Sequence, residues 1–132
     1  MSLVFITGAA RRIGKNLAIN FAKKGWNVAI NYNKSESQAI ETRDLCCSFG
    51  VKAEIYKADV SNKAEIISAF DKSIIDLGVP DVLINNAGVF PNRTNIDEIS
   101  EELIDETFGV NLKGEFFTSQ HFSQLAKPNS RI

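Results

Sequence analysis

Short apolar segments alternate with amphipathic helical segments along the chain, and this alternation limits the fold more than any other feature. Four apolar segments are predicted as strands, at residues 3–7, 28–31, 52–57 and 81–85. Helical spacing of apolar residues predicts helices between them, at residues 12–24, 35–49 and 62–77. Because strand–helix–strand crossovers are almost always right-handed, the pattern favours a parallel sheet with helices on both faces. We therefore predict one doubly wound α/β domain over residues 1–132.

The last third of the chain is predicted to be mostly helical. After a loop at residues 91–95, Ser100 is expected to cap a short helix that carries Glu101 and Glu102 in its first turn. A further helix is expected over residues 110–127, ended by Pro128. Its phenylalanines fit either a core or an interface with another chain. His121, amid this cluster, is expected to pack or to form a hydrogen bond rather than to bind a metal.

Composition excludes several classes of partner. Fifteen basic and sixteen acidic residues give a net charge of −1, which provides no general attraction for nucleic acid or an anionic membrane. The sequence has no apolar run long enough to cross a bilayer. Its two cysteines are adjacent, so they offer neither a disulfide framework nor metal-ligand spacing, and a reducing, cytoplasmic setting is expected. No metal site is predicted.

The segment TGAARRIG at residues 7–14 joins the first strand to the first helix. A glycine turn opening a helix presents free backbone N–H groups and the positive end of a helix dipole, which suit a pyrophosphate. Gly8 would allow the tight turn, and Gly14 would let the helix approach the sheet closely. Arg12 stands where such turns usually have their middle glycine. A plain strand-to-helix loop is the alternative interpretation.

The end of the second strand is expected to select the cofactor. Dinucleotide folds that bind NAD usually place an acid there for the ribose 2′-hydroxyl, whereas this chain has Asn33, Lys34 and Ser35, with no acid before Glu36. A lysine beside small polar donors suits a 2′-phosphate, and Arg11 could add a second positive charge. The pattern therefore favours NADP(H), although Lys34 could also be a solvated loop residue.

Polar residues also follow the third and fourth strands. Asp59 could accept a hydrogen bond from an adenine amino group while Val60 packs on the ring, or Asp59 could simply begin the next helix. Two small residues, Ala87 and Gly88, leave room for a flat ligand at the end of the fourth strand. Asn111 is predicted as a buried asparagine early in its helix, with a structural or a water-binding role.

Taken together, these segments resemble the short-chain dehydrogenase/reductase family, in the order and spacing of that family and across all 132 residues. The resemblance implies a Rossmann fold, a family asparagine at Asn111 that holds a water in the catalytic proton relay, and assembly as a homo-oligomer. It also implies three groups of cofactor contacts: Thr7, Gly8, Arg12, Ile13 and Gly14 at the pyrophosphate; Asp59 and Val60 at the adenine; Asn86, Ala87 and Gly88 at the ribose and backbone.

The sequence departs from the family in its catalytic residues. Family reductases carry a serine on the fifth strand and then a Tyr-x-x-x-Lys pair, whereas the tyrosines here, Tyr32 and Tyr56, have no lysine four residues on. Residues 129–132 resemble the start of the fifth strand, so the domain is expected to be truncated there, with the catalytic residues beyond Ile132. The predicted function is NADP(H)-dependent hydride transfer to a small carbonyl, alcohol or pterin-like substrate. A non-catalytic dinucleotide-binding or regulatory module is the main alternative, and a flavodoxin-like or receiver domain fits the alternation less well.

Arg12 is a second departure from the family. Two basic residues before Ile13-Gly14 resemble the pteridine-reductase branch, where the arginine reaches over the phosphates toward the substrate. That branch also has a serine where this chain has Gly88. A 3-oxoacyl-carrier-protein reductase or a general carbonyl reductase fits the sequence equally well.

Overall fold

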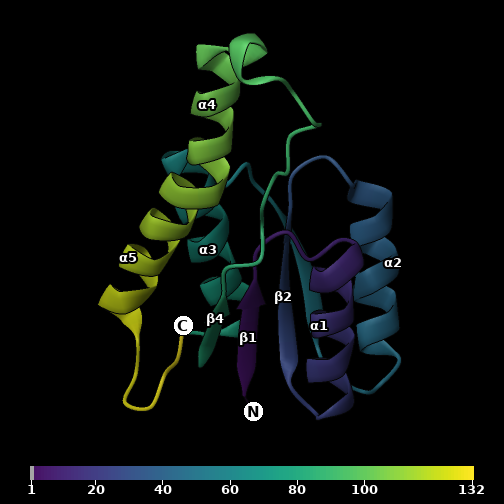
Figure 1. Cartoon of the computed structure of the whole chain (residues 1–132). Helices are drawn as coiled ribbons and strands as arrows, with labels where there is room; N and C mark the ends of the chain where they lie inside the picture. Colours follow the sequence, from purple (N-terminus) through teal and green to yellow (C-terminus); the bar gives the residue numbers. More distant parts are fainter. Residues whose placement is uncertain (1) are drawn as a thin grey trace.

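A parallel sheet of four strands forms the centre of the protein, in a computed structural model that describes residues 2–132 (Figure 1). The strands are β1 (Leu3–Ile6), β2 (Asn27–Tyr32), β3 (Ala53–Lys57) and β4 (Val82–Ile84). Their order in the sheet is β3-β2-β1-β4. Strand order therefore reverses direction after β3, at the step from β1 to β4, as in the first half of a Rossmann fold, and the predicted fold class is confirmed.

Helices cover both faces of this sheet. Helices α1 (Arg12–Lys23) and α2 (Glu36–Cys47) lie on one face. Helices α3 (Lys63–Leu77) and α5 (Glu115–Leu125) lie on the other face. Helix α4 (Glu101–Phe108), which a short 3₁₀ turn (Ile96–Glu98) precedes, extends past the carboxyl ends of the strands (Figure 1). The four predicted strands and the first three predicted helices match these elements apart from one or two residues at their ends.

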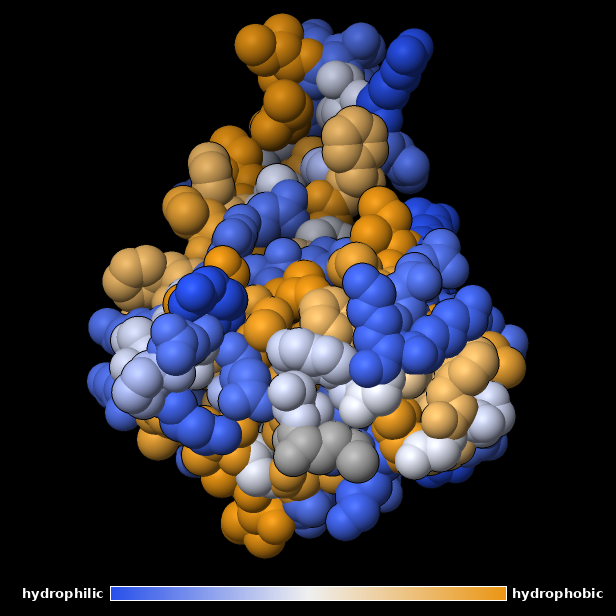
Figure 2. Space-filling model, turned by 90° about the horizontal axis from the view of Figure 1, so that it is seen from below, coloured by the Kyte–Doolittle hydropathy of each residue, from blue (hydrophilic) through white to orange (hydrophobic). Residues whose placement is uncertain are grey.

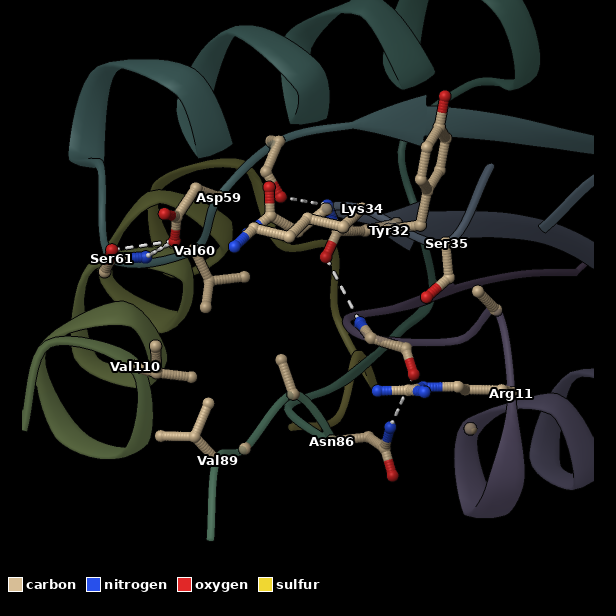
Figure 3. A pocket seen from close by; sticks show the side chains of 18 of the residues that line it. Arg11, Tyr32, Lys34, Ser35, Asp59, Val60, Ser61, Asn86, Val89 and Val110 are labelled. Carbon is tan, nitrogen blue, oxygen red and sulfur yellow. Dashed lines mark hydrogen bonds between the residues drawn. The ribbon is translucent and has the colours of Figure 1, made fainter. Parts of the chain in front are cut away.

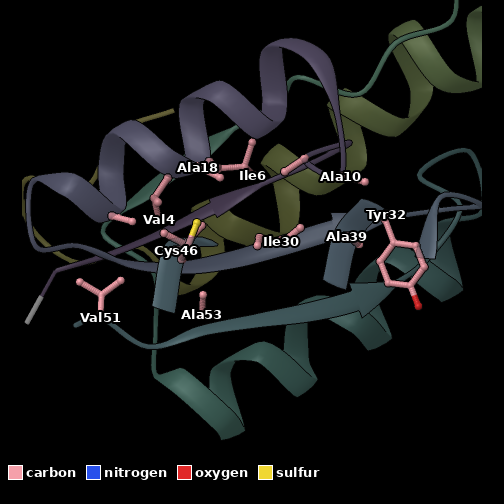
Figure 4. Close-up of a cluster of buried hydrophobic side chains, with 13 residues drawn as sticks. Val4, Ile6, Ala10, Ala18, Ile30, Tyr32, Ala39, Cys46, Val51 and Ala53 are labelled. Atoms are coloured by element: carbon pink, nitrogen blue, oxygen red, sulfur yellow. The ribbon is translucent and has the colours of Figure 1, made fainter. Parts of the chain in front are cut away.

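Alternation along the strands divides the core into two clusters. Residues Val4 and Ile6 of β1 face α1 and α2, whereas Leu3 and Phe5 face α3 and α5. Figure 4 shows the first cluster, in which small and branched side chains from the strands meet Ala18, Ala39 and Cys46 from the helices. Because successive strand side chains point to opposite faces, the central strands are apolar at almost every position.

The last two helices follow one another without a loop between them. Helices α4 and α5 are joined by a π-helical segment, Gly109–Gly114, and together they form one long, continuous rod beside the sheet (Figure 1). A Cβ atom on Gly114 would lie only 2.7 Å from the carbonyl oxygen of Val60, so glycine permits the close contact between this rod and the end of β3.

The phenylalanines of this rod have two different environments. Phe122 is buried and packs against Phe70 of α3, whereas Phe116 is exposed. Four exposed apolar residues follow one another at intervals of four positions: Ile104, Phe108, Leu112 and Phe116. In Figure 2 hydrophobic residues are frequent on the left-hand side, the side on which Figure 1 places α4 and α5. Phe122 is therefore a core residue, whereas an interface stays a prediction for the exposed Phe116.

His121 connects the rod to α3. Its Nε2 atom lies 2.7 Å from the Oδ1 atom of Asp71, and its ring meets Phe70 edge-on. The expectation that His121 packs and forms a hydrogen bond is confirmed.

The outer edge of β4 carries the beginning of further pairing. Arg131 forms an isolated parallel bridge with Val82, because its N–H donates to the Asp81 carbonyl and its own carbonyl accepts from Leu83, both at 3.0 Å. Residues 129–132 thus begin strand-like pairing at the position predicted for a fifth strand. Among residues 2–132, no helix has the length and apolar character needed to span a bilayer.

Candidate functional site

A cleft of about 530 Å³ opens at the carboxyl ends of the strands (Figure 3). This is the edge at which ligands bind in open α/β sheets, where strand order reverses. All predicted cofactor-contacting residues except Thr7 line the cleft: Gly8, Arg11, Arg12, Ile13, Gly14, Asn33, Lys34, Ser35, Asp59, Val60, Asn86, Ala87 and Gly88. The fold therefore brings four separate sequence segments to one cavity.

Two glycines make the turn between β1 and α1 possible. Gly8 adopts a φ of +61°, and a Cβ atom there would lie 2.8 Å from the Cα atom of Ala87. A Cβ atom on Gly14 would lie 2.4 Å from the Gly8 carbonyl oxygen and 2.6 Å from the Asn86 amide nitrogen. Any side chain at either position would push the turn away from β4, so the close packing requires glycine at both positions.

Arg12 occupies the left-handed region of the backbone, with a φ of +53°. This conformation places the Cβ atom of an L-residue close to its own carbonyl, which is why glycine is favoured at such a position. Arg12 is nevertheless accommodated, because its side chain is exposed and lies at the cleft. The turn therefore has the same backbone path that a glycine at this position would adopt without strain.

Thr7 lies beneath the turn instead of lining the cleft. Its buried hydroxyl oxygen accepts hydrogen bonds from the backbone N–H groups of Asn86 and Ala87, each at 3.0 Å. The Asn86 side chain returns two bonds, from Nδ2 to the carbonyl oxygens of Thr7 and Gly8. These four bonds join the ends of β1 and β4 and fix the floor of the cleft.

Asn31 has a similar role that the sequence interpretation missed. Its side chain is buried at the end of β2, where Oδ1 accepts from the Gly8 N–H and Nδ2 donates to the carbonyls of Tyr56 and Ala58. One amide thus connects the glycine turn to β3. An asparagine as the last inward-facing residue of an otherwise apolar strand was the available signal, because a buried amide needs several partners.

The end of β2 carries the positive side of the cleft. Arg11, Asn33, Lys34 and Ser35 line the cleft here, beside the N-terminus of α2. Among residues 2–132 the Ser35 hydroxyl makes no capping hydrogen bond to α2, so it is available to a ligand. Two positive side chains, a hydroxyl and a helix N-terminus therefore lie at the same cleft, and such groups suit an anion.

Asp59 shapes the chain before α3 and also lines the cleft. Its Oδ1 atom accepts from the Ser61 N–H at 2.9 Å and from the Ser61 hydroxyl at 2.7 Å, which shapes the chain before α3. Asn62 then caps α3 by accepting from the Glu65 N–H. Asp59 still lines the cleft, and in Figure 3 it lies with Val60 on the side away from Arg11.

Asn111 differs from the prediction of a buried helical asparagine. It is exposed, lies in the π-helical segment, and does not line the cleft. Its side chain instead forms a pair of 2.8 Å bonds with the backbone of Val89, accepting from the N–H and donating to the carbonyl. Asn111 therefore holds the segment after β4 against the rod, and π-helical insertions of this kind often occur at functional sites.

Eight cleft residues were not predicted from the sequence: Ala10, Asn31, Tyr32, Ala58, Ser61, Val89, Glu106 and Val110. Val89, Glu106 and Val110 form the wall beside the rod, and Ser61 lies beside Asp59. No motif marked them, because they come together only through the path of α4 past the ends of the strands. Next to this wall, the Asn85 amide donates to the Ser119 hydroxyl at 2.8 Å, and its buried Oδ1 atom has no partner among residues 2–132.

Comparison with known proteins agrees with this geometry. The family model described as short chain dehydrogenase matches residues 2–132. The chain belongs to the short chain dehydrogenase family. It is 34% identical over 130 residues to a hydroxynaphthalene reductase-like protein, Arp2, of Metarhizium guizhouense, and 44% identical over 125 residues to an uncharacterized oxidoreductase of Thermotoga maritima.

These relatives are about twice as long as the chain. The alignment with the Metarhizium protein covers 98% of the chain but only 48% of that relative. The Thermotoga alignment covers 95% of the chain and 48% of that relative. Among solved structures, a short-chain dehydrogenase/reductase of Serratia marcescens superposes with a TM-score of 0.91 at 28% identity, over 96% of this chain and 51% of that one. A Burkholderia cenocepacia protein named as a dehydrogenase, solved with bound NADP, superposes at 0.88 with 33% identity, over 93% and 47%.

The first test concerns the bonds beneath the turn. Replacing Thr7 with valine keeps the shape but removes the oxygen that accepts from Asn86 and Ala87. We expect a loss of about 1–3 kcal/mol in the free energy of unfolding, because two amides lose their partner. Equilibrium urea unfolding measures it. Thr7→Ser, which keeps the hydroxyl, is the control, and equal losses in the two variants would show that the hydrogen bonds are unimportant.

The second test concerns backbone strain at Arg12. Arg12→Gly and Arg12→Ala remove the same charged side chain, but only glycine adopts a positive φ at little cost. We expect the glycine variant to be more stable than the alanine variant by about 1 kcal/mol in urea unfolding. Equal stability of the two variants would contradict a strained left-handed backbone at this residue.

Proposed function

We propose that this chain is the dinucleotide-binding half of an NADP(H)-dependent oxidoreductase. The observation that carries the proposal is one cleft that joins a glycine turn at a helix N-terminus to a positively charged rim at the end of β2. The NADP-bound relative from Burkholderia supports the choice of cofactor. A purely structural loop would not need these groups to converge.

Different groups of cleft residues suit the successive parts of the cofactor. The N-terminus of α1, with Gly8, Arg12, Ile13 and Gly14, would face the pyrophosphate. Asp59 and Val60 would hold the adenine by a hydrogen bond and by packing. Asn86, Ala87 and Gly88 would lie against the ribose. In each case the cleft supplies small residues or exposed donors rather than a filled wall.

The preference for NADP(H) over NAD(H) rests on the charge at the end of β2. Arg11 and Lys34 provide two positive groups at the cleft, and Ser35 provides a donor. A 2′-phosphate carries negative charge and three acceptor oxygens, so each positive group favours it over a neutral 2′-hydroxyl.

Bound NADP(H) would supply or accept a hydride, which is chemistry of the cofactor itself. The residues of this chain would hold and orient it, and Asn111 would fix the segment after β4 through Val89. The serine, tyrosine and lysine that assist proton transfer would come from a part of the protein that follows residue 132, because the chain spans about half the length of its relatives. The substrate would be a small carbonyl, an alcohol or a pterin-like compound that Arg12 helps to position.

The exposed stripe of α4 and α5 favours a homo-oligomer. Ile104, Phe108, Leu112 and Phe116 form a continuous apolar line on one side of the rod. Two copies of the rod could bury these lines against each other, which would remove a hydrophobic surface from water.

Cofactor affinity tests the main proposal. In the full-length protein, Lys34→Ala should weaken NADPH binding about tenfold and leave NADH binding almost unchanged, since only NADPH places a phosphate near this side chain. Fluorescence titration of both cofactors measures the change. Lys24→Ala, a loss of the same charge just after α1, is the matched control. Equal affinity of the unaltered protein for NADPH and NADH would overturn the cofactor assignment, and binding without turnover of any carbonyl would favour the non-catalytic module.

The oligomer has a test of its own. Leu112→Glu places a charge in the middle of the stripe, so we expect sedimentation velocity to show a shift of the full-length protein to smaller species. Leu112 is 60% exposed in the chain, so the fold itself should tolerate the change. Ile75→Glu, at an exposed residue of α3 outside the stripe, is the control and should not alter the assembly. An unchanged oligomer in the Leu112 variant would rule out this surface.

A further inference from the structure

One carboxylate lies close to the positive end of the cleft. Glu36 is the first residue of α2 and directly follows Ser35, one of the cleft residues. A carboxylate here would repel a phosphate if its side chain turned toward the cleft, and it could accept a hydrogen bond from a ribose hydroxyl instead. Glu36 does not line the cleft, so its side chain is directed elsewhere.

A tyrosine holds Glu36 in that position. The hydroxyl of Tyr32 donates to the Oε1 atom of Glu36 at 3.0 Å. Tyr32 is only 4% exposed and packs in the core cluster beneath α1 and α2, so its ring has little freedom to move. In Figure 3 the ring points away from Arg11, and the hydroxyl lies at its far end. A rigid, buried side chain therefore presents a fixed donor to a flexible, exposed carboxylate.

The protonation state of Tyr32 suits this role. Burial and then the Glu36 carboxylate raise the pKa of the Tyr32 hydroxyl above its ordinary value, so the group remains a donor at neutral pH. A hydrogen bond to a charged acceptor is also among the stronger kinds in proteins. The contact is thus able to hold one rotamer of Glu36 against the others that an exposed glutamate would occupy.

We propose that Tyr32 is a positioning residue that holds Glu36 away from the cleft and thereby makes its β2 end selective for a 2′-phosphate. The inference rests on the proposed function, since it concerns the same nucleotide site. It differs from the roles of Arg11 and Lys34, which attract the phosphate directly. Tyr32 acts by removing a competing negative charge.

The test uses two small probes that differ only in the group of interest. Adenosine 2′,5′-bisphosphate carries the 2′-phosphate, and AMP carries a hydroxyl there. Their dissociation constants would be measured by calorimetry on the full-length protein and on the variants Tyr32→Phe, Glu36→Gln and the double variant. Phenylalanine preserves the packing of the ring, so only the hydroxyl is lost, and circular dichroism would confirm that the variant is folded.

Tyr32→Phe should weaken binding of the bisphosphate about fivefold, because the released Glu36 carboxylate can approach the phosphate, while AMP binds as before or more tightly. Glu36→Gln should bind the bisphosphate at least as well as the unaltered protein. In the double variant, affinity for the bisphosphate should return to that of Glu36→Gln, since no carboxylate remains to be released. This rescue is the result that a merely structural tyrosine would not give.

The chain offers a matched control at its other tyrosine. The Tyr56 hydroxyl also donates to a carboxylate, the Oδ2 atom of Asp76 at 3.2 Å, but neither residue lines the cleft. Tyr56→Phe should leave the ratio of the two dissociation constants unchanged. Equal weakening of both probes by Tyr32→Phe, or no rescue by Glu36→Gln, would overturn the inference. Failure of the bisphosphate to bind the unaltered protein would instead contradict the proposed function.

Discussion

The hydrogen-bonded connection between the ends of β1 and β4 holds the rest of the site in place. Thr7 accepts from two backbone amides after β4, and Asn86 donates back to two carbonyls after β1. Polar groups buried at a strand end must be paired, so this reciprocal set favours one arrangement of the two ends. Asn31 extends the connection to β3 through Gly8. The cleft is therefore built from backbone held by three side chains.

Arg12 illustrates how a rigid turn can tolerate an unfavourable residue. Its left-handed backbone costs free energy, but Gly8, Gly14 and the bonds to β4 determine the path of the chain on both sides. Strain of this kind persists only where the surroundings impose it, and it tends to occur at functional sites. The positive side chain gained at the cleft is the corresponding benefit, since it stands beside the backbone amides that face an anion.

The fold and most of the cleft could be predicted from the sequence because both follow from local patterns. Strand-to-helix alternation gave the sheet, and glycines, Lys34 and Asp59 lie next to strand ends that any parallel sheet brings together. The continuity of α4 and α5 could not be predicted, because a π-helical segment leaves no clear mark in residue spacing. For the same reason Asn111 was expected to be buried, and the wall residues Glu106 and Val110, which the path of that rod carries to the cleft, were missed.

The charge at the end of β2 shows why residue type alone does not define specificity. The sequence supplies two positive side chains, Arg11 and Lys34, and one carboxylate, Glu36, around the end of β2. Their net charge alone does not show which ribose substituent is favoured. The side-chain positions separate them, because Arg11 and Lys34 line the cleft while Glu36 is bonded to Tyr32. Since Coulomb energy falls with distance and rises with burial, the direction in which one exposed carboxylate points changes the field that a phosphate meets. A tyrosine packed in the core can therefore influence binding at the cleft through the carboxylate that it holds.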